Sequence, residues 1–140
     1  DILYGIPGAR QPGATQADLV AAADVFAYFG DLDPVMAVAA SLTLDEGLLA
    51  LSLEAGPEDC DWVLQSSLRY CHGEAYLRGV LETHGFDLVS LSREAIRRDG
   101  ADQITGLLAI ARKRSAVGAE PPENAKASGA GRNIVGIALN

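Results

Sequence analysis

Cysteine, methionine and tryptophan are scarce in this chain. Its 140 residues include two cysteines, one methionine and one tryptophan. Cys60 and Cys71 have neither a CxxC spacing nor an array of His, Asp or Cys residues that would form a zinc site. We therefore expect two reduced thiols and no metal site.

Long apolar runs and an excess of basic residues are also missing. No run approaches the roughly 20 apolar residues of a membrane helix, and the first residues lack the basic-then-apolar order of a signal peptide. The sequence therefore predicts no membrane insertion and a cytoplasmic location. The formal net charge is −8, which opposes binding to nucleic-acid phosphates.

The charges are unevenly distributed along the chain. Residues 1–68 hold eleven acids and one base, whereas residues 69–114 hold eight bases and six acids. Two interpretations of the second half stay open: it favours an anionic small substrate, or it is a solvated strand edge.

The overall composition, 49% hydrophobic and 21% charged residues, is typical of a globular domain.

The sequence is organised around residues 18–33. Leu19 to Ala23 form an unbroken apolar run, as expected of a parallel strand covered on both faces. Asp24 follows at the carboxyl end of that strand, where ligands bind in open α/β sheets. Asp33 and Pro34 then predict the N-cap and first residue of a helix.

The next elements follow the same alternation. Apolar spacing predicts a helix of about ten residues from Pro34. A turn is predicted at residues 45–47, and residues 47–53 predict a second covered strand. A second helix is predicted from about Gly73, with Gly85 following it where a left-handed cap is expected. Residues 87–98 and 104–112, separated by the turn signal Asp99-Gly100, predict an antiparallel hairpin. The expected fold class is α/β, with two parallel strands, two covering helices and a terminal hairpin.

Both ends of the chain differ from this pattern. Residues 1–17 are predicted to be an irregular leader, and their glycines have no preceding strand or following helix that would make a nucleotide loop. Residues 114–140 are predicted to be a largely disordered tail, because they are poor in large apolar groups. For the apolar residues 134–139 the sequence leaves three alternatives open: they dock onto the domain, they add an edge strand or they have no role.

Several segments together carry a family resemblance. They are Ala22, Ala23, Asp24, Val25, Tyr28, Gly30, Asp31 and Leu32, then residues 47–54, Leu64-Gln65, residues 69–72 with Tyr76, Gly85-Phe86, residues 96–98 and residues 106–108. In order and spacing, residues 18–113 resemble the C-terminal half of a class I, Rossmann-like S-adenosylmethionine-dependent methyltransferase. The resemblance is closest to a bacterial subgroup associated with tetratricopeptide repeats.

The resemblance implies a cofactor wall of Ala23, Asp24, Val25 and Tyr28. Asp24 would face the amino-acid moiety of S-adenosylmethionine, although it could instead cap a turn, and Tyr28 could instead be a core aromatic. The family's glycine loop and ribose-binding acid have no counterpart in residues 1–140. We therefore expect S-adenosylmethionine to bind the isolated chain weakly or not at all.

A second set of residues, Arg69, Tyr70, His72 and Tyr76, is predicted to contact the substrate. Arg69 suits a carboxylate or phosphate, and His72 suits a general base toward the methyl acceptor. The alternative is structural: Arg69 pairs with an acid, Tyr76 is helix core and His72 lies at the start of a helix. His84 is expected to be a core residue or a partner of the helix dipole.

These observations favour methyl transfer to a small molecule. The alternative is an inactive remnant or interaction module that keeps only the substrate half of the fold. Because about half of the expected sheet is missing, residues 19–23 would form a bare edge. We expect self-association at that edge, or docking of residues 134–139 onto it.

Overall fold

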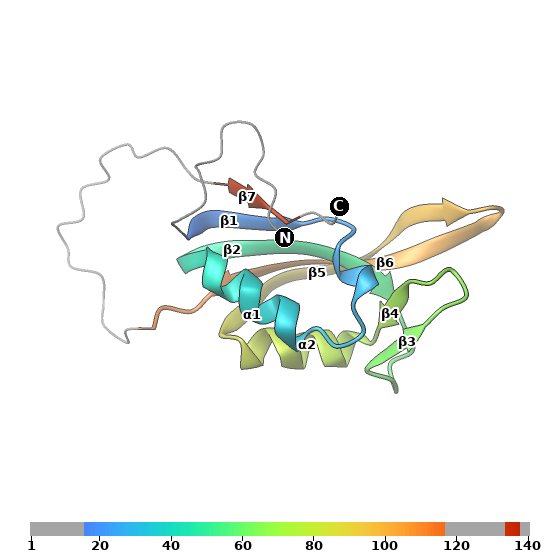
Figure 1. The fold of residues 1–140 in the computed structure, drawn as a ribbon, viewed down its shortest axis with the longest axis horizontal. Coiled ribbons are helices and arrows are strands. Elements are labelled where there is room, and N and C mark those ends of the chain that lie inside the picture. The colour runs from blue at the N-terminus through green and yellow to red at the C-terminus, as the bar shows by residue number, and fades with distance from the viewer. Residues whose placement is uncertain (1–15, 117–133, 138–140) are drawn as a thin grey trace.

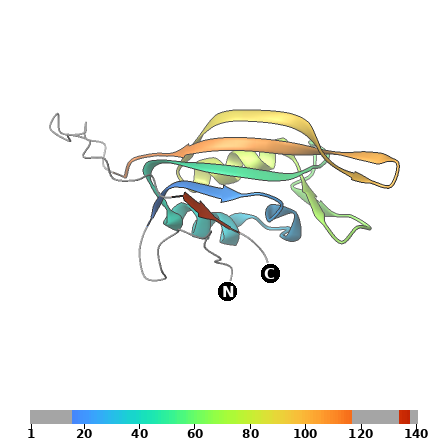
Figure 2. The same ribbon diagram turned by 90° about the horizontal axis from the view of Figure 1, so that it is seen from above.

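The computed structural model describes residues 16–116 and 134–137. They form one mixed sheet with two α-helices (Figure 1). Five strands lie side by side in the order β7, β1, β2, β6, β5, and the short strands β3 and β4 continue from the far end of β2 (Figure 2). The predicted α/β class is confirmed, with parallel and antiparallel strands in one sheet.

The first unit is a strand, a helix and a parallel strand. β1 (Ala17–Ala22) pairs in parallel with β2 (Thr43–Ala55), and α1 (Asp33–Leu42) connects them. The register sets Val20 beside Leu49, so the buried side chains of both strands lie on the same face. The predicted parallel pair is therefore present.

Two local details differ from the sequence prediction. Leu32, not Asp33, is the N-cap of α1, and the Asp31 carboxylate accepts the Asp33 N–H at 3.0 Å. The predicted turn at residues 45–47 lies inside β2, where Glu46 has a φ of 64°. The residues predicted to form a turn thus form an irregular part of the strand, near the register shift between β1 and β2.

The second half begins with α2 (Glu74–Thr83), whose C-cap is His84. The predicted glycine, Gly85, follows in a left-handed conformation with a φ of 82°. β5 (Phe86–Asp99) and β6 (Asp102–Lys113) form the predicted antiparallel hairpin. β6 also pairs antiparallel with β2, joining the hairpin to the sheet. The far ends of β5 and β6 project beyond the other strands as a long arm (Figure 1).

Three short strands lie in segments for which the sequence predicted no definite strand. β3 (Trp62–Leu64) and β4 (Tyr70–His72) form a short hairpin within the segment that the sequence indicated to be least regular. β7 (Ile134–Gly136) lies in the predicted tail and pairs in parallel with β1. Of the two outcomes expected at that edge, self-association or docking of residues 134–139, this strand shows docking of residues 134–136. Residues 1–15, 117–133 and 138–140 lie outside the described residues, and Ala17, the last residue of the predicted leader, begins β1.

The two faces of the sheet have different surroundings. α1 and α2 lie on the same face (Figure 1), over a core whose largest fully buried side chains include Phe26, Met36, Leu49, Leu53, Leu77, Leu81, Phe86 and Leu107. On the opposite face, Leu108 and Ile110 are about two-fifths exposed. We call this second surface the open face.

Candidate functional site

Asp24 lies just beyond β1, at the carboxyl edge of the sheet. Its backbone is left-handed, with a φ of 59°, which is uncommon for a residue with a side chain. The N–H of Asp24 donates to Ser52 Oγ at 3.0 Å, and its side chain is 64% exposed. The predicted site residue therefore presents its carboxylate at the edge where α/β sheets bind ligands.

The other predicted members of the cofactor wall divide between core and surface. Val25 is 1% exposed and belongs to the hydrophobic core, whereas Ala23 and Tyr28 are exposed. Tyr28 ends a single 3-10 turn, Phe26–Tyr28. Ala23, Asp24 and Tyr28 can line a site with their side chains, and Val25 only with its backbone.

Arg69 connects three of these groups. Its Nε donates to Glu54 Oε1 at 2.8 Å, its Nη1 donates to the Tyr28 hydroxyl at 2.8 Å, and its Nη2 donates to Asp24 Oδ1. The guanidinium also lies 4.8 Å from the centre of the Tyr28 ring. Burial, followed by the charge of Arg97, lowers the pKa of Arg69. Arg69 remains a cation, because its ordinary pKa is far above neutral.

Glu54 is a site residue that sequence analysis did not identify. Its side chain is 1% exposed. Besides Arg69, it accepts hydrogen bonds from Arg97 Nε and Nη2, at 3.0 and 2.8 Å, and from Gln65 Nε2 at 2.5 Å. We call Asp24, Glu54, Arg69 and Arg97 the charged cluster. The sequence signal for Glu54 was a carboxylate at the end of an apolar strand. The side chains that bind it lie 11 to 43 residues away in the sequence.

Aromatic side chains gather next to this cluster. The Tyr76 hydroxyl accepts the Leu32 N–H at 2.9 Å and donates to Asp31 Oδ1 at 3.3 Å, and burial raises the pKa of Tyr76. The Trp62 ring lies 5.2 Å from the Tyr76 ring. A methyl group at Gly30 would come within 2.7 Å of Trp62 and 3.0 Å of Tyr70, so glycine permits this close packing.

His72 lies inside the protein, 0% exposed. Its Nε2 is 2.9 Å from the Phe29 carbonyl oxygen and 3.0 Å from that of Gly30, so Nε2 carries the proton and donates. Nδ1 is buried and has no partner among the described residues. Burial lowers the pKa of His72, which favours the neutral ring. This placement favours a structural role over that of a general base, which stays a prediction.

The remaining predicted groups are peripheral to the cluster. His84 Nε2 lies 2.8 Å from Asp33 Oδ1, joining the end of α2 to the start of α1. Cys60 and Cys71 are free thiols. Within residues 16–116 and 134–137, no group of three His, Cys, Asp or Glu residues could hold a metal ion, and no helix is long and apolar enough to cross a membrane.

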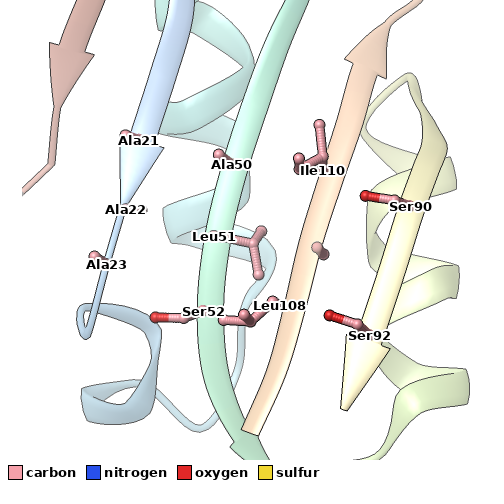
Figure 3. A pocket seen from close by; sticks show the side chains of 11 residues that line it. Ala21, Ala22, Ala23, Ala50, Leu51, Ser52, Ser90, Ser92, Leu108 and Ile110 are labelled. Atoms are coloured by element: carbon pink, nitrogen blue, oxygen red, sulfur yellow. The ribbon is translucent and has the colours of Figure 1, made fainter. Parts of the chain in front are cut away.

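A shallow groove of about 360 Å³ crosses the open face (Figure 3). Its lining residues come from β1, β2, β5 and β6 and are mostly small: Ala21, Ala22, Ala23, Ala50, Leu51, Ser52, Ser90, Ser92, Leu108, Ala109 and Ile110. The helices lie behind the strands in this view, so the groove is on the face that they do not cover (Figure 3). Through Ser52, the groove reaches the backbone of Asp24.

No protein-family model matches this chain, and none of the curated proteins does. Solved structures of S-adenosylmethionine-dependent methyltransferases share its fold. One, from Methanosarcina mazei, has a TM-score of 0.55 and 11% identity, over 69% of this chain and 59% of that one. Another is the 1,6-didemethyltoxoflavin-N1-methyltransferase of Burkholderia thailandensis, with a TM-score of 0.56, 18% identity and coverage of 74% and 48%.

A third similar structure is the N-methyltransferase NodS of Bradyrhizobium japonicum, with bound S-adenosylhomocysteine. The TM-score is 0.51 and the identity 17%, over 75% of this chain and 50% of that one. The present chain thus spans about half to three-fifths of the length of these three proteins. At such identities the likeness establishes the fold, which is that of part of a class I methyltransferase.

Proposed function

We propose that this chain forms part of an enzyme that transfers a methyl group from S-adenosylmethionine to a small molecule. The observation that carries the proposal is Asp24, whose exposed carboxylate lies at the carboxyl end of β1 in a methyltransferase-like sheet. That edge is the ligand side of open α/β folds. Two similar structures contain bound S-adenosylhomocysteine, which supports this choice of cofactor.

The residues present fit one side of a cofactor site. Asp24 carries a negative charge suited to the cofactor's ammonium group, and the exposed side chains of Ala23 and Tyr28 leave space and an aromatic surface beside it. The cofactor, when bound, supplies the electrophilic methyl group. This chain would contribute position and charge, and direct displacement requires chiefly alignment of the two reactants.

Arg69, Tyr70 and Tyr76 are the proposed substrate side of the site. Arg69 lies beside Asp24 and Tyr28 and retains N–H groups for a carboxylate or phosphate on the acceptor. Tyr70 and Tyr76 pack around the same edge, next to Trp62. The identity of the acceptor does not follow from these groups, so the proposal ends at a small molecule.

We further propose that the cofactor-binding half of the domain lies outside residues 1–140. The similar methyltransferases are longer than this chain, and the open face supports the same inference. Parallel strands are normally covered on both faces, yet the groove over the parallel strands β1 and β2 is open. Leu108 and Ile110, on the adjoining antiparallel strand β6, are also well exposed. A second helical layer over the groove would cover them.

One observation favours the alternative, an inactive remnant or interaction module. The Asp24 carboxylate is already bound by Arg69, which in turn is bound by buried Glu54. A chain that keeps only this half of the fold could retain the charged cluster for stability alone.

Location and partners are proposed in the same way for both functions. The free thiols support a cytoplasmic protein, and the acidic net charge supports the absence of nucleic-acid partners.

Calorimetric titration with S-adenosylhomocysteine tests the proposal. Residues 1–140 alone should bind weakly or not at all, because losing two or three hydrogen bonds to charged groups costs roughly 1.5 to 3 kcal/mol each. A chain that also contains the glycine loop and the ribose acid should bind at micromolar concentration, and Asp24→Ala should weaken that binding. Equal affinity in Asp24→Ala would contradict the role of Asp24. Absence of binding in the longer chain would favour the interaction module.

A further inference from the structure

Glu54 connects parts of the carboxyl edge that are far apart in the sequence. Gln65 and Arg69 belong to the β3–β4 hairpin and its connection, whereas Arg97 belongs to the projecting arm of β5 and β6. The Glu54 carboxylate accepts four hydrogen bonds from these three side chains. It therefore joins the two projections that flank Asp24.

Backbone pairing alone holds the hairpin weakly. β4 pairs with β2 at only two positions, Glu54 with Cys71 and Ala55 with His72. Trp62, Val63 and Leu64 on β3 are all more than one-third exposed, so apolar burial contributes little on that strand. β4 is also held by buried His72, which donates to the carbonyls of Phe29 and Gly30. The side-chain bonds to Glu54 add a second attachment, through the connection between β3 and β4.

The charge of Glu54 also determines where Arg69 can lie. Arg69 and Arg97 both donate to Oε1 of Glu54, and without that negative charge two guanidinium groups this close would repel each other. Arg69 in turn donates to Asp24 and Tyr28. Any movement of Arg69 is therefore transmitted to the exposed carboxylate of Asp24.

We propose that Glu54 is a positioning residue for this site: its buried carboxylate fastens the β3–β4 hairpin to the β5–β6 arm and sets Arg69 against Asp24. The inference rests on the proposed function for the meaning of the site. The attachment itself is a property of this chain that can be measured without cofactor.

Glu54→Gln tests the proposal, because glutamine keeps the shape and removes the charge. Glu74→Gln is the matched control: Glu74 also pairs with two arginines, Arg78 and Arg93, but it is partly exposed on α2. Amide hydrogen exchange over residues 62–72 should be roughly tenfold faster or more in Glu54→Gln than in the control. The emission of Trp62, the single tryptophan, should shift to longer wavelength.

A second variant covers the case in which Glu54→Gln fails to fold. Arg97→Met leaves Glu54 bound to Arg69 and Gln65, and it should change hairpin exchange in the same direction by a smaller factor. If hairpin exchange and Trp62 emission in Glu54→Gln match the control while only the melting temperature falls, Glu54 is merely structural and the proposal is overturned. If Glu54→Gln does not fold, unchanged exchange in Arg97→Met overturns it.

These results separate the two proposals. A hairpin that loosens in Glu54→Gln, together with failure of every form to bind S-adenosylhomocysteine, would overturn the methyltransferase function and leave the attachment established. Where the longer chain binds the ligand, Glu54→Gln should weaken binding to a similar extent as Asp24→Ala. Loss of attachment without any change in affinity would contradict the link from Glu54 through Arg69 to Asp24.

Discussion

The two faces of this sheet differ in what their side chains contact. Leu107 and Leu108 are neighbours on β6, yet Leu107 is fully buried under the helices and Leu108 is 38% exposed on the open face. The same alternation runs along β2, where Leu49 and Leu53 are fully buried and Ala50 and Ser52 line the groove. One face is therefore a completed core, and the other is an apolar surface that the described residues leave uncovered.

The largest expected effect is on the covered face. Leu107→Ala should lower the free energy of unfolding by about 2–5 kcal/mol, because it removes buried methyl groups and leaves a cavity beneath the helices. Urea denaturation of the variant measures this change. A loss as small as that of a surface substitution would show that the covered face is not the stabilising core.

An intermediate effect is expected from His72, which is buried at the edge of the covered core. Burial lowers its pKa in the folded state, so below an unfolded-state pKa of about 6.5 the unfolded chain binds a proton that the folded chain does not. The stability that the neutral, buried His72 contributes is therefore present above that pH and is lost as the pH falls. The contribution changes by at most about 1.4 kcal/mol per pH unit.

His72→Gln separates this effect from the titration of the carboxylates. The glutamine amide can still donate to the backbone carbonyls of Phe29 and Gly30, but it does not titrate. As the pH is lowered from 7.5 to 5, the melting temperature should fall less steeply in the variant than in the wild type. Identical slopes would mean that His72 is accessible to protons in the folded state.

The smallest effect on stability is expected on the open face. Leu108→Glu should change the free energy of unfolding by about 0.5 kcal/mol or less, as at other exposed positions. We expected self-association at the β1 edge or docking of residues 134–139 onto it, and β7 pairs there. The open face is a remaining exposed apolar surface. Any concentration-dependent association should weaken in Leu108→Glu, as measured by sedimentation velocity. Unaltered association would place the contact elsewhere.

Sequence reasoning located the elements whose signals are local. The apolar run before Asp24, the spacing that follows Pro34 and the Asp99-Gly100 turn each depend on neighbouring residues, and the corresponding strand, helix and hairpin are present. These patterns reflect burial on a strand or helix face and the backbone freedom of glycine, which the chain encodes within about ten residues. Asp24 was placed at the edge by the same local reasoning.

Tertiary structure decided the rest. The partners of Glu54 are residues 65, 69 and 97, and β7 pairs with β1 across more than 110 residues of sequence. Buried His72 donates its hydrogen bonds to the backbone carbonyls of residues 29 and 30. None of these pairings has a local pattern, since each depends on which segments the sheet brings together. Burial of a charge or an imidazole is favourable only after distant partners are in place, and the sequence alone does not show where those partners will lie.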